Sequence, residues 1–147
     1  MPARVRAFCA HTGQTEPIDP GAVVRCILES LALKHAQTID VLASVTGTVP
    51  EEIHLVGGGS RNELLCRWTA GAAGLPVLAG PEEATLLGNL LVQAMALGEL
   101  ASIEDGREIV RRSFAPTVYE PQDAALWREA RERFVKAFAL PTLEVGA

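Results

Sequence analysis

The chain has 147 residues, of which 48% are apolar and 21% charged, the balance of an ordinary globular domain with a core of its own. Its net charge of −5 argues against general nucleic-acid binding, which needs a basic face. No apolar run reaches the roughly 20 residues that cross a bilayer, and the N-terminus lacks the apolar segment of a signal peptide. We therefore expect a cytoplasmic protein without a nucleic-acid or membrane partner.

The cysteines give no sign of a disulfide framework or a metal centre. Cys9, Cys26 and Cys66 are odd in number and scattered, and no two of them form a CxxC pair. We expect all three to be small buried apolar groups, and we assign no metal ligand.

The first third of the chain predicts a short lead-in followed by one long helix. Residues 1–18 show no clear period and predict at most a helical turn around Arg4–Ala10, as if the domain began further upstream. Asp19 is a suitable N-cap and Pro20 a suitable first helical residue. Apolar residues then recur at helical spacing as far as Leu42, and Gly47 is placed to end the helix.

The most informative stretch is a short apolar segment, residues 53–56, that runs directly into three glycines, residues 57–59. A helix signal follows, because Ser60 and Glu63 have the spacing of a capping box and the helix can run from Arg61 to about Ala73. Glycine admits positive φ and close approach by a ligand, and a helix N-terminus offers free N–H groups. The stretch therefore predicts strand, tight turn and helix.

Two interpretations of the glycines stay open. They can hold a ligand, or they can merely let a strand reverse into a helix. A phosphate-binding P-loop needs Lys-Ser/Thr after the glycines, which Arg61 and Asn62 do not supply. The dinucleotide fingerprint Gly-x-Gly-x-x-Gly is matched only in part, because Asn62 stands where its third glycine belongs.

A second short strand, residues 76–79, follows the glycine-linked helix. Two strands joined by a helix predict a parallel pair, and both are apolar throughout, as strands covered on two faces are. Glu82 and Glu83 precede a further helix over about Ala84–Leu97. They are typical of a helix start, although one of them could serve a site beyond the strand. The fold class is therefore α/β, with a short parallel sheet packed by helices.

The remaining residues predict a connector and a last helix. Residues 99–120 form the connector, with a short helix over Ile103–Arg112 and irregular or weakly extended chain over Phe114–Tyr119. Asp123 is the expected cap of an amphipathic helix that Pro141 ends. We assign residues 19–140 to one domain and residues 141–147 to a frayed tail.

Several segments, in this order, resemble the C-terminal part of carbohydrate kinases of the FGGY family. The resemblance runs from about Arg6 to Phe138. It rests on Phe8-Cys9, Thr12-Gly13-Gln14, the stretch Arg25–Lys34, the glycine stretch Val56–Asn62 and the stretch Ala79–Asn89.

The resemblance implies a partial actin-like ATPase (ribonuclease-H-like) lobe, with ATP and sugar bound in a cleft between this lobe and another. By position, it implies that the backbone of Gly58 and Gly59 contacts the nucleotide and that Asn62 contributes its amide. Glu83, Ala84, Thr85 and Asn89 would support the cleft rather than do chemistry.

The same resemblance implies that the catalytic aspartate, the phosphate loop and most sugar contacts lie upstream of the residues present here. We assign no catalytic residue to this chain. We expect the C-terminal ATP-binding portion of a kinase, a fragment or one piece of a split enzyme. It would be inactive alone, would use Mg²⁺ only in the complete enzyme, and would meet the sugar only with the missing N-terminal portion.

Two other functions are alternatives to a partial kinase. One is a stand-alone nucleotide-binding or interaction module of non-enzymatic type, and the other is a dinucleotide-binding domain. An open apolar surface near the strand ends also predicts self-association, most simply as a homodimer to which the helix Asp19–Thr46 contributes.

Overall fold

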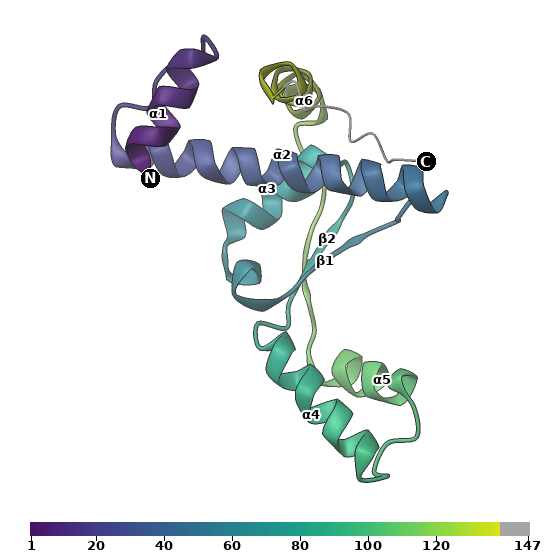
Figure 1. Cartoon of the computed structure of the whole chain (residues 1–147). Helices are drawn as coiled ribbons and strands as arrows, with labels where there is room; N and C mark the ends of the chain where they lie inside the picture. Colours follow the sequence, from purple (N-terminus) through teal and green to yellow (C-terminus); the bar gives the residue numbers. More distant parts are fainter. Residues whose placement is uncertain (139–147) are drawn as a thin grey trace, which may run out of the picture.

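The computed structural model describes residues 1–138 as six α-helices, one 3₁₀ helix and a three-stranded sheet (Figure 1). The expected tail, residues 141–147, lies outside the described residues. The elements in chain order are α1 (Pro2–His11), α2 (Pro20–Thr46), β1 (Ile53–Leu55), η1 (Gly57–Arg61), α3 (Glu63–Ala73), β2 (Val77–Ala79), α4 (Ala84–Ala96), α5 (Ile103–Ser113), β3 (Thr117–Tyr119) and α6 (Ala124–Phe138).

Helix α2 begins and ends where the sequence predicts. The Asp19 carboxylate accepts a hydrogen bond from the backbone N–H of Ala22 at 2.9 Å, and Pro20 is the first helical residue. Gly47 ends the helix with φ +68°, a conformation that favours glycine. Helix α2 packs against α3 with Ala32 and Ala36 fully buried, and these small side chains let the two helices approach closely.

Residues 1–18 are not the irregular lead-in that the sequence predicts. They form the ten-residue helix α1 and a return loop that packs beside α2. The Arg6 guanidinium donates hydrogen bonds to the carbonyls of Pro17 and Ile18, and the Cys9 side chain is buried. The hydrogen bonds tie α1 to the loop that leads into α2, a contact that the periodicity of the sequence does not reveal.

The sheet has the order β1-β2-β3 and is mixed. β1 and β2 are parallel neighbours, as expected, with Ile53 opposite Val77. The segment that looked irregular or weakly extended instead contains β3, which pairs antiparallel with β2 and places Tyr119 opposite Val77. β2 is thus the central strand, and its buried Val77 and Ala79 pack against Cys66 and other core residues of α3.

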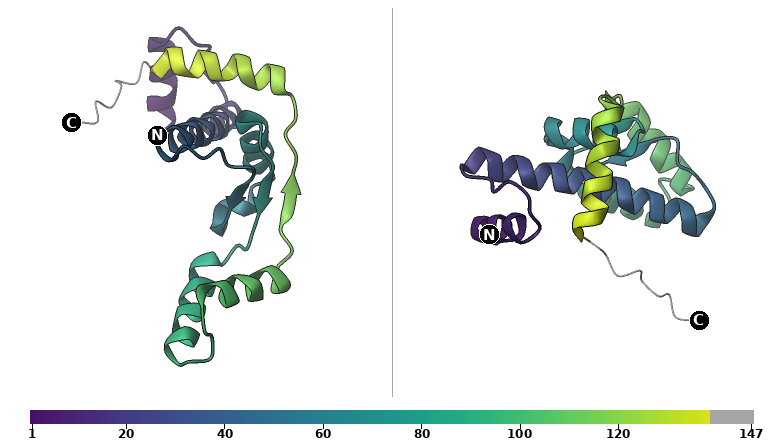
Figure 2. Two further views of the ribbon diagram at one scale, coloured as in Figure 1. Left: turned by 90° about the vertical axis from the view of Figure 1, so that its right-hand side faces the viewer. Right: turned by 90° about the horizontal axis from the view of Figure 1, so that it is seen from above.

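Two parts extend away from the sheet (Figure 2). Helix α6 follows β3 and crosses α2 on the side away from the strands, where Trp127 and Phe134 pack against the α2–α3 cluster. Helices α4 and α5 form a hairpin that projects from the other end of the molecule (Figures 1 and 2). Among residues 1–138, no helix combines the length and the apolar character needed to cross a membrane.

Candidate functional site

The glycine turn is a 3₁₀ helix, Gly57–Arg61, that follows β1 after Val56. Gly57 has φ +76°, so a glycine is required there. The capping-box prediction for Ser60 is wrong: its hydroxyl is buried and donates to the carbonyl of Gly57 at 2.7 Å. The serine therefore closes the turn rather than capping the helix, and α3 begins two residues later than expected.

Asn62 takes over the capping role. Its side-chain Oδ1 accepts a hydrogen bond from the backbone N–H of Leu65 at 3.0 Å, so α3 starts at Glu63. Asparagine is as good an N-cap as serine, and this preference was the signal that could have placed the helix start correctly. The Asn62 side chain thus stands at the junction of the turn and the helix, with one of its two polar atoms already engaged.

The loop after β2 lies directly beside the glycine turn. The backbone N–H of Gly57 donates to the carbonyl of Pro81 at 3.0 Å, and that of Gly80 donates to the carbonyl of Leu55 at 2.9 Å. Both loops leave the carboxyl ends of parallel strands, the edge at which α/β domains bind ligands. The structure therefore brings together two segments that are separated along the sequence.

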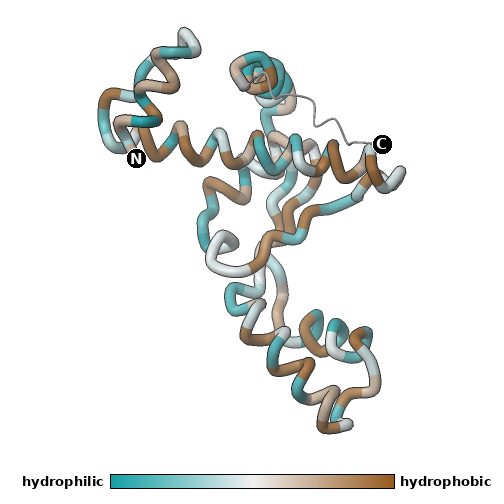
Figure 3. Tube along the Cα trace, viewed as in Figure 1, coloured by the Kyte–Doolittle hydropathy of each residue, from teal (hydrophilic) through white to brown (hydrophobic). Residues whose placement is uncertain are grey.

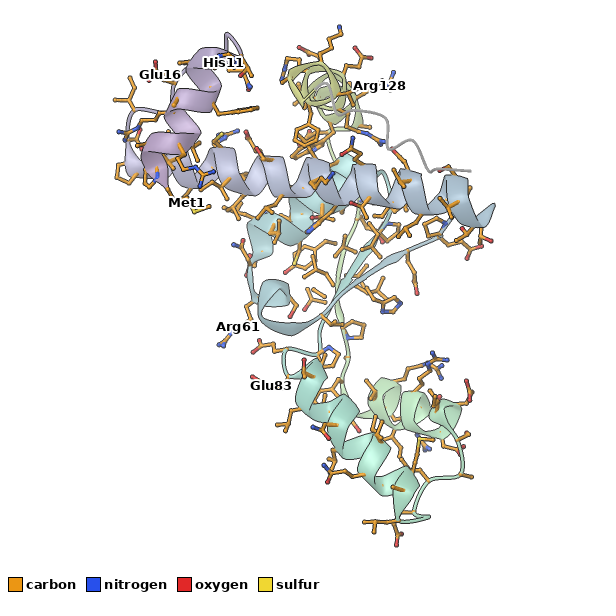
Figure 4. The ribbon with its side chains drawn as sticks, in the orientation of Figure 1. Met1, His11, Glu16, Arg61, Glu83 and Arg128 are labelled. Carbon is orange, nitrogen blue, oxygen red and sulfur yellow. The ribbon has the colours of Figure 1, made fainter. Side chains whose placement is uncertain are left out.

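Charged side chains flank the paired loops. Arg61 forms an exposed ion pair with Glu82, with Nε and Oε2 3.2 Å apart, a pairing that the sequence analysis missed. Figure 4 shows Arg61 and Glu83 projecting outward from the two neighbouring loops. Glu83 is the N-cap residue of α4 but makes no side-chain capping bond. Glu83 therefore lies at the helix start, as the sequence predicts, and its carboxylate is not engaged in capping the helix.

The glycines differ in the direction of their missing side chains. A Cβ built on Gly58 meets no atom within 4 Å, whereas one on Gly59 lies 3.4 Å from Cδ2 of Leu55. Gly58 therefore faces open space and Gly59 faces the strand beneath. The exposed backbone at Gly58 is where a flat ligand could approach most closely.

The groups at the glycine turn are suited to binding a ligand. The turn supplies backbone N–H groups and the Arg61 guanidinium. No group of three or more His, Cys, Asp or Glu side chains within residues 1–138 is arranged to hold a metal ion. Cys9, Cys26 and Cys66 are free thiols. Burial raises the pKa of the Cys66 thiol, which favours its neutral form.

A large hollow of about 1230 Å³ lies elsewhere, between α1, α2 and α6. Phe8, Trp68, Trp127 and Phe134 contribute to its walls. It is on the face of α2 away from the strands, and none of the glycine-turn residues lines it. The hollow and the glycine turn are therefore separate features.

Replacing Asn62 by Ala should lower the free energy of unfolding by about 1 kcal/mol, because the Leu65 N–H loses its partner. Replacing it by Ser should change stability little, since a hydroxyl can accept the same bond. Urea unfolding of the purified variants measures both values. An Ala variant with an unchanged midpoint and slope would show that this side chain does not cap α3.

Comparison with known proteins gives the family of this domain, whose fold is of the actin-like ATPase type. Residues 1–97 match the model of the FGGY family of carbohydrate kinases, C-terminal domain. The chain belongs to this family.

The relatives in this family include proteins named rhamnulokinase. The chain is 44% identical over 134 residues to that of Bacteroides thetaiotaomicron and 41% identical over 121 residues to that of Klebsiella pneumoniae. The matches cover 91% and 82% of this chain but only 28% and 25% of those relatives. The chain thus corresponds to the C-terminal part of such a kinase. These matches give no support to a stand-alone non-enzymatic module.

Proposed function

We propose that the chain forms the nucleotide-side part of an ATP-dependent carbohydrate kinase, with adenosine lying over the glycine turn. One observation carries the proposal: the open backbone at Gly58 stands where the loops of two parallel strands meet, within a domain of an FGGY kinase. The flat purine and the ribose attached to it could approach the backbone of Gly58 and Gly59 without meeting a side chain there. The amide nitrogen of Asn62 could contact the nucleotide while its oxygen caps α3.

The chain's contribution to phosphoryl transfer would be positioning. This reaction needs an oriented acceptor hydroxyl, a base and a metal on the phosphates. The chain would hold ATP at its adenosine end, and Mg²⁺ would enter with the phosphates, which it commonly coordinates in kinases. The base and the sugar contacts would come from the part of the kinase that this chain does not match. In a cell the assembled enzyme would work in the cytoplasm, where ATP is available.

The acceptor we propose is L-rhamnulose or a similar ketose, on the strength of the rhamnulokinase relatives. Purified chain with ATP, Mg²⁺ and L-rhamnulose should yield no sugar phosphate above a heat-killed control. Addition of the N-terminal portion of the Bacteroides relative should restore turnover that requires both polypeptides. Turnover by the chain alone that disappears on mutation of Gly58 would contradict the proposal that this chain supplies only part of the active site.

A further inference from the structure

Helix α4 carries an apolar face that no described element covers. The helix has no buried residue, and its main neighbour within residues 1–138 is α5. Leu86, Leu90 and Leu97 are 66%, 61% and 80% exposed. Leu86 and Leu90 are one turn apart on α4, and Leu97, the C-cap residue, follows seven residues later on the same side. We call these three residues the leucine stripe.

The composition of α4 is that of an interior helix. No charged residue occurs from Ala84 to Leu97. Its polar side chains, Thr85, Asn89 and Gln93, follow one side of the helix, and Figure 3 shows hydrophobic colour along much of the rest. The exposed leucine stripe is therefore typical of a surface that packs against another polypeptide.

Helix α5 cannot be that cover, because it occupies a different side of α4. Leu91 of α4 packs against Gly106 of α5, where a built Cβ would lie 3.5 Å from Cδ1 of the leucine. The other side of α5 carries exposed ion pairs, Glu104 with Arg107 and Glu108 with Arg111. Such a charged face is typical of solvent, so α5 shields one side of α4 and leaves the leucine stripe open.

The position of the stripe indicates what covers it. Helix α4 starts at Ala84, directly after the loop whose Pro81 carbonyl accepts the N–H of Gly57. A polypeptide that packs on the Leu86 end of the stripe therefore lies near the glycine turn. In a kinase, the polypeptide that presents the sugar must stand beside the nucleotide. The rhamnulokinase relatives have about three quarters of their length outside the match to this chain.

We propose that the leucine stripe is the docking surface for the polypeptide that precedes this domain in FGGY kinases. The inference rests on the proposed function and names the partner of the nucleotide site. A second copy of this chain on the stripe would stand beside the glycine turn without supplying a base or a sugar site, so it fits the position less well.

Complex formation with the N-terminal portion of the Bacteroides relative, co-expressed with this chain, tests the assignment. The stripe variant is Leu86→Glu with Leu90→Glu. The matched control is Val41→Glu with Val45→Glu on α2, two valines that are 53% and 78% exposed at the same spacing. The stripe variant should bind roughly 100-fold more weakly, because two leucines lose their apolar contacts and two charges are desolvated. The control should bind like the original chain.

Circular dichroism verifies that both variants keep their helices, and a milder Leu86→Ala, Leu90→Ala pair should show a smaller loss in the same direction. Binding that is unchanged in the stripe variant, equally weakened in the control, or absent from the original chain overturns the proposal. The proposal is also overturned if light scattering shows that the original chain and the control are homodimers and that the stripe variant is a monomer. A complex that forms through the stripe but binds no ATP refutes the proposed function and leaves the docking surface standing.

Discussion

Replacement of Gly71 by Ala should destabilise the domain by about 2 kcal/mol, an unusual result for a Gly→Ala change inside a helix. A Cβ at this position would lie 2.3 Å from Nε1 of Trp127 and 2.9 Å from the carbonyl of Gln122. Overpacking of this kind costs about 3 kcal/mol, whereas the helix propensity of alanine returns about 1 kcal/mol. Trp127 must therefore move, and α6 must shift from α3.

The matched control is Gly88→Ala in α4, where a Cβ meets nothing within 4 Å. It should stabilise the helix by up to about 1 kcal/mol. Urea unfolding gives both values, and near-ultraviolet circular dichroism follows the Trp68–Trp127 pair, whose ring centroids are 6.4 Å apart. In a Trp127→Ala background the Gly71 change should destabilise less, because only the close contact with the Gln122 carbonyl remains. An equal gain at both glycines would mean that α6 does not pack against Gly71.

The Gly58→Val variant should lose at least about tenfold in ATP affinity while keeping its free energy of unfolding within about 0.5 kcal/mol. Gly58 does not have a positive φ, and its Cβ would point into open space, so the fold can accept a side chain. That same side chain would occupy the surface on which we place adenosine. Isothermal calorimetry or equilibrium dialysis measures the affinity.

Two further glycines act as references for this variant. Gly59→Val should lose stability as well as affinity, because its Cβ faces Leu55 at 3.4 Å. This direction makes Gly58 the cleaner position, although the sequence alone would suggest either glycine. Gly88→Val, away from the turn, should bind ATP like the original chain. Equal ATP binding by the original chain and the Gly58 variant would place the nucleotide elsewhere.

Features set by neighbouring residues could be predicted from the sequence. Asp19, Pro20 and Gly47 act within one or two turns of the helix ends that they define, and α2 has the expected bounds. The strand–glycine–helix order and the parallel pairing of β1 with β2 are also confirmed, because apolar strands joined by a helix have few other arrangements.

Features that depend on distant partners could not be predicted. β3 exists because Thr117–Tyr119 pairs with β2, about 40 residues earlier in the chain. Helix α1 is held by hydrogen bonds from Arg6 to carbonyls across a loop. Ser60 and Asn62 are both good N-caps, and only the tight turn decides between them, because it uses the serine hydroxyl to bind Gly57. The ion pair of Arg61 with Glu82 likewise depends on two loops meeting.

A nuclear magnetic resonance titration of the isotope-labelled chain with Mg-ATP is the most direct test of the central claim, because it detects binding of only millimolar affinity. We predict that the amide signals of Gly57–Asn62 and Gly80–Glu83 shift together as ATP is added, and that Gly58→Val abolishes the shifts. Signals that move only around the hollow between α1, α2 and α6, or no movement at millimolar ATP, would contradict a nucleotide site at the glycine turn.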